Sequence, residues 1–189
     1  MKWGMNFNMD LINLFRKQKF LPIINSKTID DDIHKIETLL EKNNTIQCIE
    51  ITLREKNSYN NALILKEKFP FIHFGLGSIL SLEMYQNYIH DNFDFYISPG
   101  IVPEIINLGI KNYIPGAETI SEFNMLNNKG YKLIKFFPSI ISGGPAKLKA
   151  IQSIYKDLIF IPTGGINQEN IKDFLALDNV VCVGMSNFD

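Results

Sequence analysis

One lysine lies inside an apolar stretch of the chain, Leu133-Ile134-Lys135-Phe136-Phe137-Pro138. The stretch has the length of a strand and ends at a proline, so it predicts a buried strand. Burying an unpaired ammonium is costly, which favours the neutral amine, and a neutral lysine amine forms Schiff bases with carbonyl compounds. The alternative is a lysine whose stem packs in the core while its head reaches water at the strand end.

A second candidate strand, Ile46–Arg54, alternates apolar residues with Glu50, Thr52 and Arg54. Because side chains alternate across a strand, these three share one face, and a carboxylate below a guanidinium could move protons beside an anion clamp. A solvated edge strand would show the same alternation. If the polar face of this strand and the face of Lys135 both point into one interior, Lys135 and Glu50 share a cavity.

The elements that must position these residues alternate strictly between strand and helix. An amphipathic segment within residues 1–20 comes first, and residues 1–189 read as one domain. Eight strands with seven intervening helices favour an α/β fold of the closed (β/α)₈ TIM-barrel type over an open doubly wound sheet, with active-site residues at the carboxyl ends of the strands. The chain ends six residues after the last strand, so we expect no eighth helix, and apolar surface on that strand uncovered. The expected strands are 21–24, 46–53, 71–74, 93–97, 112–114, 133–138, 158–161 and 180–183, and helices are expected at 30–40, 59–68, 82–89, from 103, and at 121–127, 147–155 and 168–175.

Two glycine pairs follow late strands. Gly164 and Gly165 come directly after the seventh strand, where close backbone approach and a following helix N-terminus suit a phosphate. A Gly-Gly turn is common in proteins. The support for a phosphate site therefore comes from the place of this turn after the seventh strand, not from the glycines alone. Ser142-Gly143-Gly144 after the sixth strand reads either as a flexible lip or as an ordinary loop.

The remaining composition excludes several classes of function. The chain has 189 residues, 46% of them hydrophobic, and a net charge of −1, so nothing points to nucleic acid, and no stretch has the length of a membrane span. Cys48 and Cys182 fall in apolar stretches, which predicts buried free thiols and a cytoplasmic location. The three histidines show no ligand spacing with carboxylates or cysteines, so we expect no metal site.

With these residues in view, the chain resembles the 2-keto-3-deoxy-6-phosphogluconate (KDPG) / 4-hydroxy-2-oxoglutarate aldolases from about residue 21 to 186. The resemblance depends on six motifs that occur in order at the expected strand ends. They are Glu50-Ile51-Thr52-Leu53-Arg54, Gly75-Leu76-Gly77-Ser78, Ile97-Ser98-Pro99-Gly100, Ile114-Pro115-Gly116, Lys135-Phe136-Phe137-Pro138 and Pro162-Thr163-Gly164-Gly165-Ile166.

The resemblance implies a class I aldolase, a lyase of carbohydrate metabolism that needs no metal or cofactor, assembled as a homotrimer. Lys135 would form the Schiff base and Glu50 would be the general acid/base. The products from the phosphorylated 2-keto acid would be pyruvate and glyceraldehyde 3-phosphate, and 4-hydroxy-2-oxoglutarate is a further expected substrate. The implied substrate-binding residues are Arg54 and Ser78 for the carboxylate, Pro99 and Phe137 for the pocket wall, and Thr163, Gly164, Gly165 and Ser186 for the distal phosphate.

The chain departs from the family pattern at three points. Ser78 stands where the family usually has threonine, and Gly184-Met185-Ser186 replaces the usual Gly-Gly-Ser, so Met185 should restrict approach of a phosphate. Asp189 and the terminal carboxylate should oppose a dianion nearby. Two other functions stay open: an eroded barrel kept as a binding or structural subunit, and another phosphate-binding barrel enzyme such as a thiamine-phosphate-synthase-like transferase.

Overall fold

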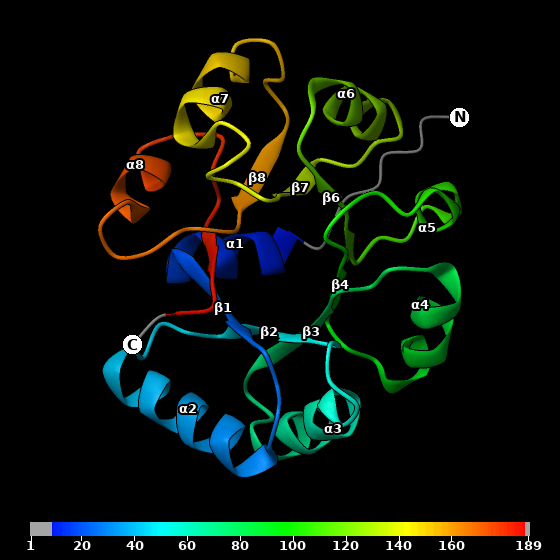
Figure 1. The fold of residues 1–189 in the computed structure, drawn as a ribbon, viewed down its shortest axis with the longest axis vertical. Coiled ribbons are helices and arrows are strands. Elements are labelled where there is room, and N and C mark those ends of the chain that lie inside the picture. The colour runs from blue at the N-terminus through cyan, green and yellow to red at the C-terminus, as the bar shows by residue number, and fades with distance from the viewer. Residues whose placement is uncertain (1–8, 188–189) are drawn as a thin grey trace.

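In the computed structural model, which describes residues 9–187, strands and helices alternate around a ring (Figure 1). The strands are β1 (Phe20–Ile24), β2 (Cys48–Thr52), β3 (His73–Gly77), β4 (Phe95–Ile97), β5 (Tyr113–Ile114), β6 (Gly116–Ala117), β7 (Leu133–Phe136), β8 (Ile159–Pro162) and β9 (Val183–Met185). The helices are α1 (Met9–Gln18), α2 (Ile29–Lys42), α3 (Ser58–Lys68), α4 (Leu82–Tyr88) with the 3-10 turn Ile89–Asp91, α5 (Pro103–Leu108), α6 (Ile120–Asn128), α7 (Gly144–Ile151) and α8 (Ile171–Leu175).

The parallel strands close into the predicted barrel through two joints. One sheet has the order β5-β4-β3-β2-β1-β9 and the other has the order β6-β7-β8. β5 and β6 form one strand position, divided by Pro115, which has no N–H to give but accepts a hydrogen bond from Lys135 N at 2.9 Å. Parallel bridges from Phe160 to Val180 and from Thr163 to Gly184 join β8 to the last strand. The expected (β/α)₈ architecture is confirmed.

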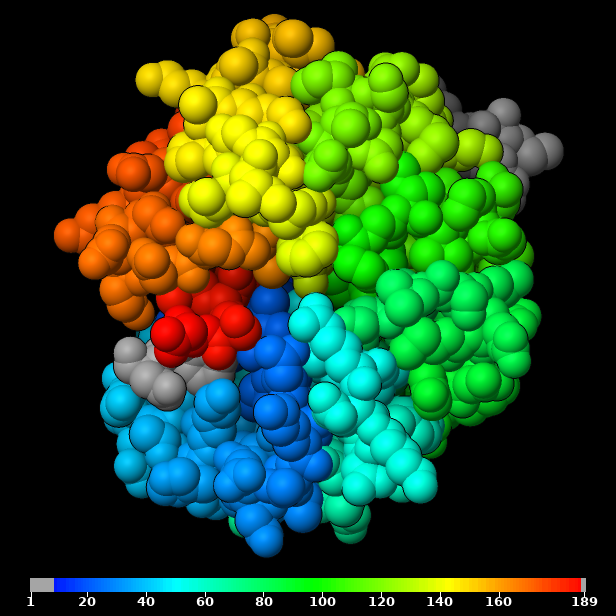
Figure 2. All heavy atoms as spheres, viewed as in Figure 1, coloured from blue at the N-terminus to red at the C-terminus, as the bar shows by residue number. Residues whose placement is uncertain are grey.

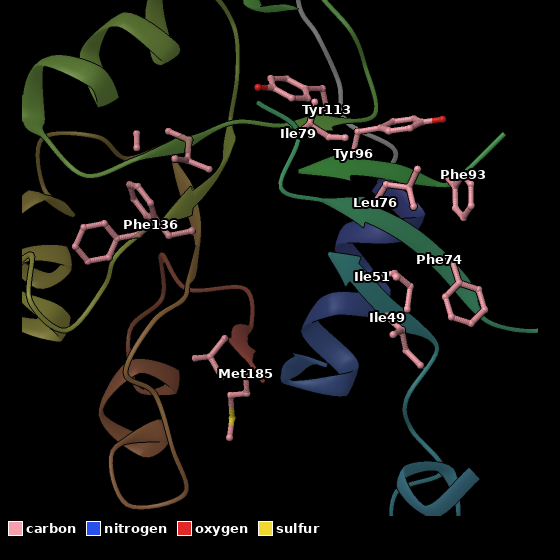
Figure 3. Packing of buried hydrophobic residues seen from close by; sticks show 14 of the residues in the cluster. Ile49, Ile51, Phe74, Leu76, Ile79, Phe93, Tyr96, Tyr113, Phe136 and Met185 are labelled. Carbon is pink, nitrogen blue, oxygen red and sulfur yellow. The ribbon is translucent and has the colours of Figure 1, made fainter. Parts of the chain in front are cut away.

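The two faces of β2 separate as the alternation predicts. Ile49 and Ile51 are fully buried in the apolar layer between strands and helices, together with Phe74 of β3 (Figure 3). Glu50 and Thr52, on the opposite face of the strand, are each 1% exposed. Because β2 pairs with β1 on one side and β3 on the other, it is no edge strand.

The helix α1 closes the amino-terminal end of the barrel, crossing the ring in Figure 1. Its Gln18 side chain donates to the carbonyls of Phe20 and Cys48 and accepts from the amide of Cys48. Cys48 and Cys182 are buried free thiols there, and burial raises the pKa of both. The apolar floor consists of Leu11, Ile12, Phe15, Leu21, Cys48, Phe95, Ile97, Ile114, Leu133, Ile161, Val181 and Cys182. Apart from Gln18, the interior at this end of the barrel is therefore apolar.

The outer face of the last strand is covered, contrary to the sequence-based expectation. No helix follows β9 within residues 9–187, yet Val183 and Met185 are 0% and 1% exposed. Met185, which is labelled in Figure 3, belongs to the same apolar cluster as Ile36 of α2 and Phe174 of α8. These flanking helices therefore bury the strand. Among the helices of residues 9–187, none has both the length and the apolar character needed to cross a membrane.

Candidate active site

Lys135 of β7 and Glu50 of β2 meet inside the barrel. The lysine Nζ lies 3.1 Å from Oε1 and 3.3 Å from Oε2 of the carboxylate, and both residues are buried, at 5% and 1% exposure. The expectation that they share one interior is confirmed. A lysine with its head in water at the strand end is excluded, because Glu50 supplies the partner that burial of the amine requires.

Space for the Glu50 carboxylate depends on a glycine in the neighbouring strand. A Cβ on Gly77 would lie 2.0 Å from Glu50 Oε1, and a Cβ on Gly75 would lie 2.0 Å from the Phe95 ring. Both glycines belong to β3, although the sequence predicted a strand that ended at Phe74. Glycine weakens an isolated strand, so local propensity argues against a strand at these two positions. The crowded barrel interior explains why both are nevertheless glycine.

Replacing Gly77 by alanine should displace the carboxylate from Lys135. We expect kcat to fall at least tenfold and the free energy of unfolding to fall by about 1–3 kcal/mol, because the added methyl overpacks the interior. Gly100→Ala is the matched control, since a Cβ there meets nothing within 4 Å. Assaying both variants with thermal unfolding in parallel tests the prediction, and full activity of the Gly77 variant would contradict it.

A cavity of about 160 Å³ opens beside the amine at the carboxyl ends of the strands. In Figure 2 the segments around it include those coloured blue (after β1), cyan (after β2), yellow (after β7), orange (after β8) and red (after β9). Every predicted site residue except Glu50 lines the cavity. The lining residues are Ile23, Asn25, Arg54, Ser78, Pro99, Lys135, Phe137, Thr163, Gly164, Gly165, Ile166, Gly184 and Ser186.

Arg54 and Ser78 form one wall of the cavity. The Arg54 Nε donates to Ser78 Oγ at 3.1 Å. Ser78 has a φ of 64°, in the left-handed region that a non-glycine residue rarely occupies, and such strain gathers at functional sites. A guanidinium with donors aimed at a cavity is suited to hold a carboxylate.

Thr163, Gly164 and Gly165 form the opposite wall with Ser186. The glycines have φ values of 99° and 78°, so their backbone turns sharply at the cavity. A Cβ on Gly184 would lie 2.2 Å from Thr163 Oγ1, so glycine is needed where the last strand meets this wall. The predicted helix directly after the glycines is shorter than expected. It begins at Ile171 rather than residue 168, after a turn in which Asn167 Oδ1 accepts from the amides of Glu169 and Asn170.

The expected obstacle at Met185 does not enter the cavity. Strand alternation sends Gly184 and Ser186 to the lining, whereas the Met185 side chain points into the outer apolar cluster (Figure 3). Asp189, which the sequence placed near the distal wall, lies outside the described residues.

The loop after β7 is an ordinary hydrogen-bonded loop. The Ser142 amide donates to the carbonyl of Pro138, and its hydroxyl donates to Glu118 at 2.7 Å. Gly143 caps α7, which begins at Gly144, earlier than the sequence predicted.

No histidine is among the residues that line the cavity. His73 at the start of β3 lies 2.8 Å from Asp94, a pairing that the sequence did not predict, at the end of the barrel away from the cavity. Between residues 9 and 187 no three His, Cys, Asp or Glu side chains gather as metal ligands would.

Sequence reasoning missed four lining residues, Ile23, Asn25, Ile166 and Gly184. Of these, Asn25 could have been predicted from the sequence. It is the first polar residue after β1, much as Arg54 is a polar residue just after the end of β2. Thr52, which the alternation did place inside, donates to its Oδ1 at 2.9 Å.

Comparison with known proteins decides the family. The model of the family described as "KDPG and KHG aldolase" matches residues 11–189. The chain belongs to this aldolase family. Aldolases are lyases, and the chain is therefore an enzyme of that class.

Known aldolases are similar to this aldolase-family chain over most of its length. The 2-dehydro-3-deoxy-phosphogluconate aldolase of Pseudomonas aeruginosa is 32% identical over 174 residues, covering 90% of this chain and 78% of the relative. The protein of the same name from Haemophilus influenzae is 31% identical, covering 94% and 84%. The KDPG aldolase of Legionella pneumophila, solved with pyruvate captured as a covalent carbinolamine intermediate, is 32% identical with a TM-score of 0.86, covering 93% of this chain and 85% of that one.

Proposed function

We propose that the chain is a class I aldolase that cleaves 2-dehydro-3-deoxy-6-phosphogluconate into pyruvate and glyceraldehyde 3-phosphate through a Schiff base on Lys135. The observation that carries the proposal is the buried contact of 3.1 Å between the Lys135 amine and the Glu50 carboxylate beside a cavity. The names of the relatives and the covalent pyruvate adduct of the Legionella enzyme support it.

The proposed reaction begins with a proton leaving the Lys135 amine for Glu50, the nearest base. The amine attacks the C2 carbonyl, and Glu50 passes the two protons that the nitrogen loses, one after the other, to the carbonyl oxygen, which leaves as water and leaves the protonated imine. Glu50 next takes the proton from the C4 hydroxyl, so that the C3–C4 bond breaks and its electrons enter the protonated imine. Glyceraldehyde 3-phosphate departs, C3 of the enamine is protonated, and water releases pyruvate from the lysine.

The two cavity walls fit the two anionic ends of this substrate. Arg54 and Ser78 would hold the carboxylate at C1, with Pro99 and Phe137 packing along the pyruvate portion. The phosphate at the other end would be held by Thr163, Gly164, Gly165 and Ser186. The Arg54 donors and the open glycine backbone on opposite walls support this orientation.

The proposal extends to the setting of the enzyme. The protonated imine is itself the electron sink, so the chemistry needs no metal or cofactor. 4-Hydroxy-2-oxoglutarate, cleaved to pyruvate and glyoxylate, is a second proposed substrate. We place the enzyme in the cytoplasm as a homotrimer, and the exposed Leu80 and Ile141 side chains, 66% and 85% accessible, support contact between subunits.

Reduction with borohydride in the presence of pyruvate tests the proposal. We expect irreversible loss of activity and one reduced pyruvate adduct, which peptide mapping assigns to Lys135 rather than to the partly exposed Lys132 of the same segment. A substrate panel on untreated enzyme should show cleavage of the phosphorylated acid.

The two rival functions give different results in the same experiment. An eroded barrel would fold and yet turn over no 2-keto-3-deoxy acid. A transferase that needs no imine would keep its activity after borohydride treatment. Either result, or an adduct on another lysine, would contradict the proposed function.

A further inference from the structure

Asn25 lies at the cavity between its two walls and has no role in the proposed reaction. It follows β1, and the strand order places β1 between β2, which leads to Arg54, and β9, which leads to Ser186. All three residues line the same cavity. In a substrate that extends from the Arg54 wall to the Ser186 wall, the middle of the carbon chain therefore lies next to Asn25.

The side chain of Asn25 is oriented so that its donor group remains available. The hydroxyl of Thr52, which is 1% exposed, donates to Asn25 Oδ1 at 2.9 Å. With the amide oxygen toward Thr52, the two N–H bonds of Nδ2 are left for another partner. Within residues 9–187, no hydrogen bond uses that nitrogen.

A buried polar cluster holds the backbone next to Asn25. Ser26, fully buried, donates to Asp32 Oδ2 at 2.5 Å and accepts from Asn61 Nδ2 at 2.9 Å. These contacts tie the β1–α2 loop to α2 and α3. Asn25 itself is exposed, but the backbone that carries it is fixed in this way, so little backbone conformational entropy is lost when it binds a ligand.

We propose that Asn25 Nδ2 donates a hydrogen bond to the C5 hydroxyl of the bound sugar acid and so selects substrates that carry this hydroxyl. The inference rests on the proposed function, in which the C1 carboxylate and the C6 phosphate occupy the two walls. The C4 hydroxyl is engaged by Glu50 in that reaction, whereas the C5 hydroxyl has no other assigned partner. Thr52 is then a positioning residue, because it acts through Asn25.

The aldol addition of pyruvate to two aldehydes tests this assignment. Glyceraldehyde 3-phosphate supplies the C5 hydroxyl, and 3-phosphopropanal has the same length and phosphate but lacks it. We expect wild-type kcat/KM to favour the hydroxylated aldehyde about tenfold, the effect of one neutral hydrogen bond at the upper end of its range. Asn25→Ala and Asn25→Asp should remove the preference, the latter keeping the acceptor for Thr52 but losing the donor.

Three further measurements separate the possible outcomes. Borohydride trapping of pyruvate should be unchanged in both Asn25 variants, because pyruvate carries no C5 hydroxyl. Thr52→Val should weaken the preference and Thr52→Ser should restore it. Asn107→Ala, which removes an exposed amide on α5 that accepts a hydrogen bond from Lys129, is the matched control and should behave as wild type.

An unchanged preference in the Asn25 variants, or an equal loss with both aldehydes, would overturn the assignment. Failure of the proposed function would look different. In that case the wild-type enzyme itself would add pyruvate to neither aldehyde and would form no borohydride adduct.

Discussion

Lys135→Arg should form no borohydride adduct with pyruvate and should lose about 10⁴-fold or more in kcat, as expected when a covalent nucleophile is removed. The guanidinium stays protonated and cannot form the imine, yet it keeps a positive charge beside Glu50. The fold should therefore survive the change. Mass spectrometry of the trapped protein, together with single-turnover kinetics, checks the prediction.

Lys135→Met is the informative companion of this variant. It also removes the nucleophile, but it leaves the 1% exposed Glu50 carboxylate buried without its cationic partner. We expect the free energy of unfolding of the methionine variant to be about 3 kcal/mol lower than that of wild type. The free energy of unfolding of the arginine variant should stay close to the wild-type value. Retained turnover in either variant would contradict the role assigned to Lys135.

Glu50→Gln should reduce kcat by about 10²- to 10⁴-fold, and the borohydride adduct with pyruvate should still form, but more slowly, because Glu50 also moves protons during imine formation. The amide keeps an oxygen near the Lys135 Nζ and nearly the same volume, but it cannot accept and return protons. Exchange of the C3 protons of pyruvate with deuterated solvent should slow along with cleavage. NMR of the exchange and borohydride trapping, compared in the same preparation, measure the two steps separately.

Glu37→Gln provides the control for the loss of a carboxylate. Glu37 lies on the outer surface of the barrel in α2 and pairs with Lys68 at 3.4 Å, with about half of its side chain exposed. Its replacement should leave exchange and cleavage unchanged. If the Glu50 variant exchanged C3 protons at the wild-type rate, another group would have to be the base.

Much of the site was predictable because the relevant signals are local. The alternation in β2 identified Glu50, Thr52 and Arg54 as one face, and this follows from the two-residue period of any strand. Lys135 stood out because a lone charge in an apolar strand needs an explanation. The regular succession of strand and helix was enough to predict a barrel, since each unit is encoded within about two dozen residues.

Other features could not be read from the chain because they depend on neighbours distant in sequence. Position 77, which pairs with Thr52 of β2, must be glycine because the Glu50 carboxylate fills the space where a side chain would be. Met185 is harmless to the cavity because α2 and α8 bury it, and the same packing covers a strand that the sequence left exposed. Asn25 became a candidate only when β1 was found between the two walls.

The amino-acid sequence by itself determined which residue types face the interior and in what order the strands follow one another. The tertiary structure alone decided that an amine and a carboxylate 85 positions apart meet at 3.1 Å, and which side chains surround them. The physical reason is that strand periodicity is a property of the local backbone. A distance across the barrel, in contrast, is set by closure of the sheet and by the packing of every interior side chain.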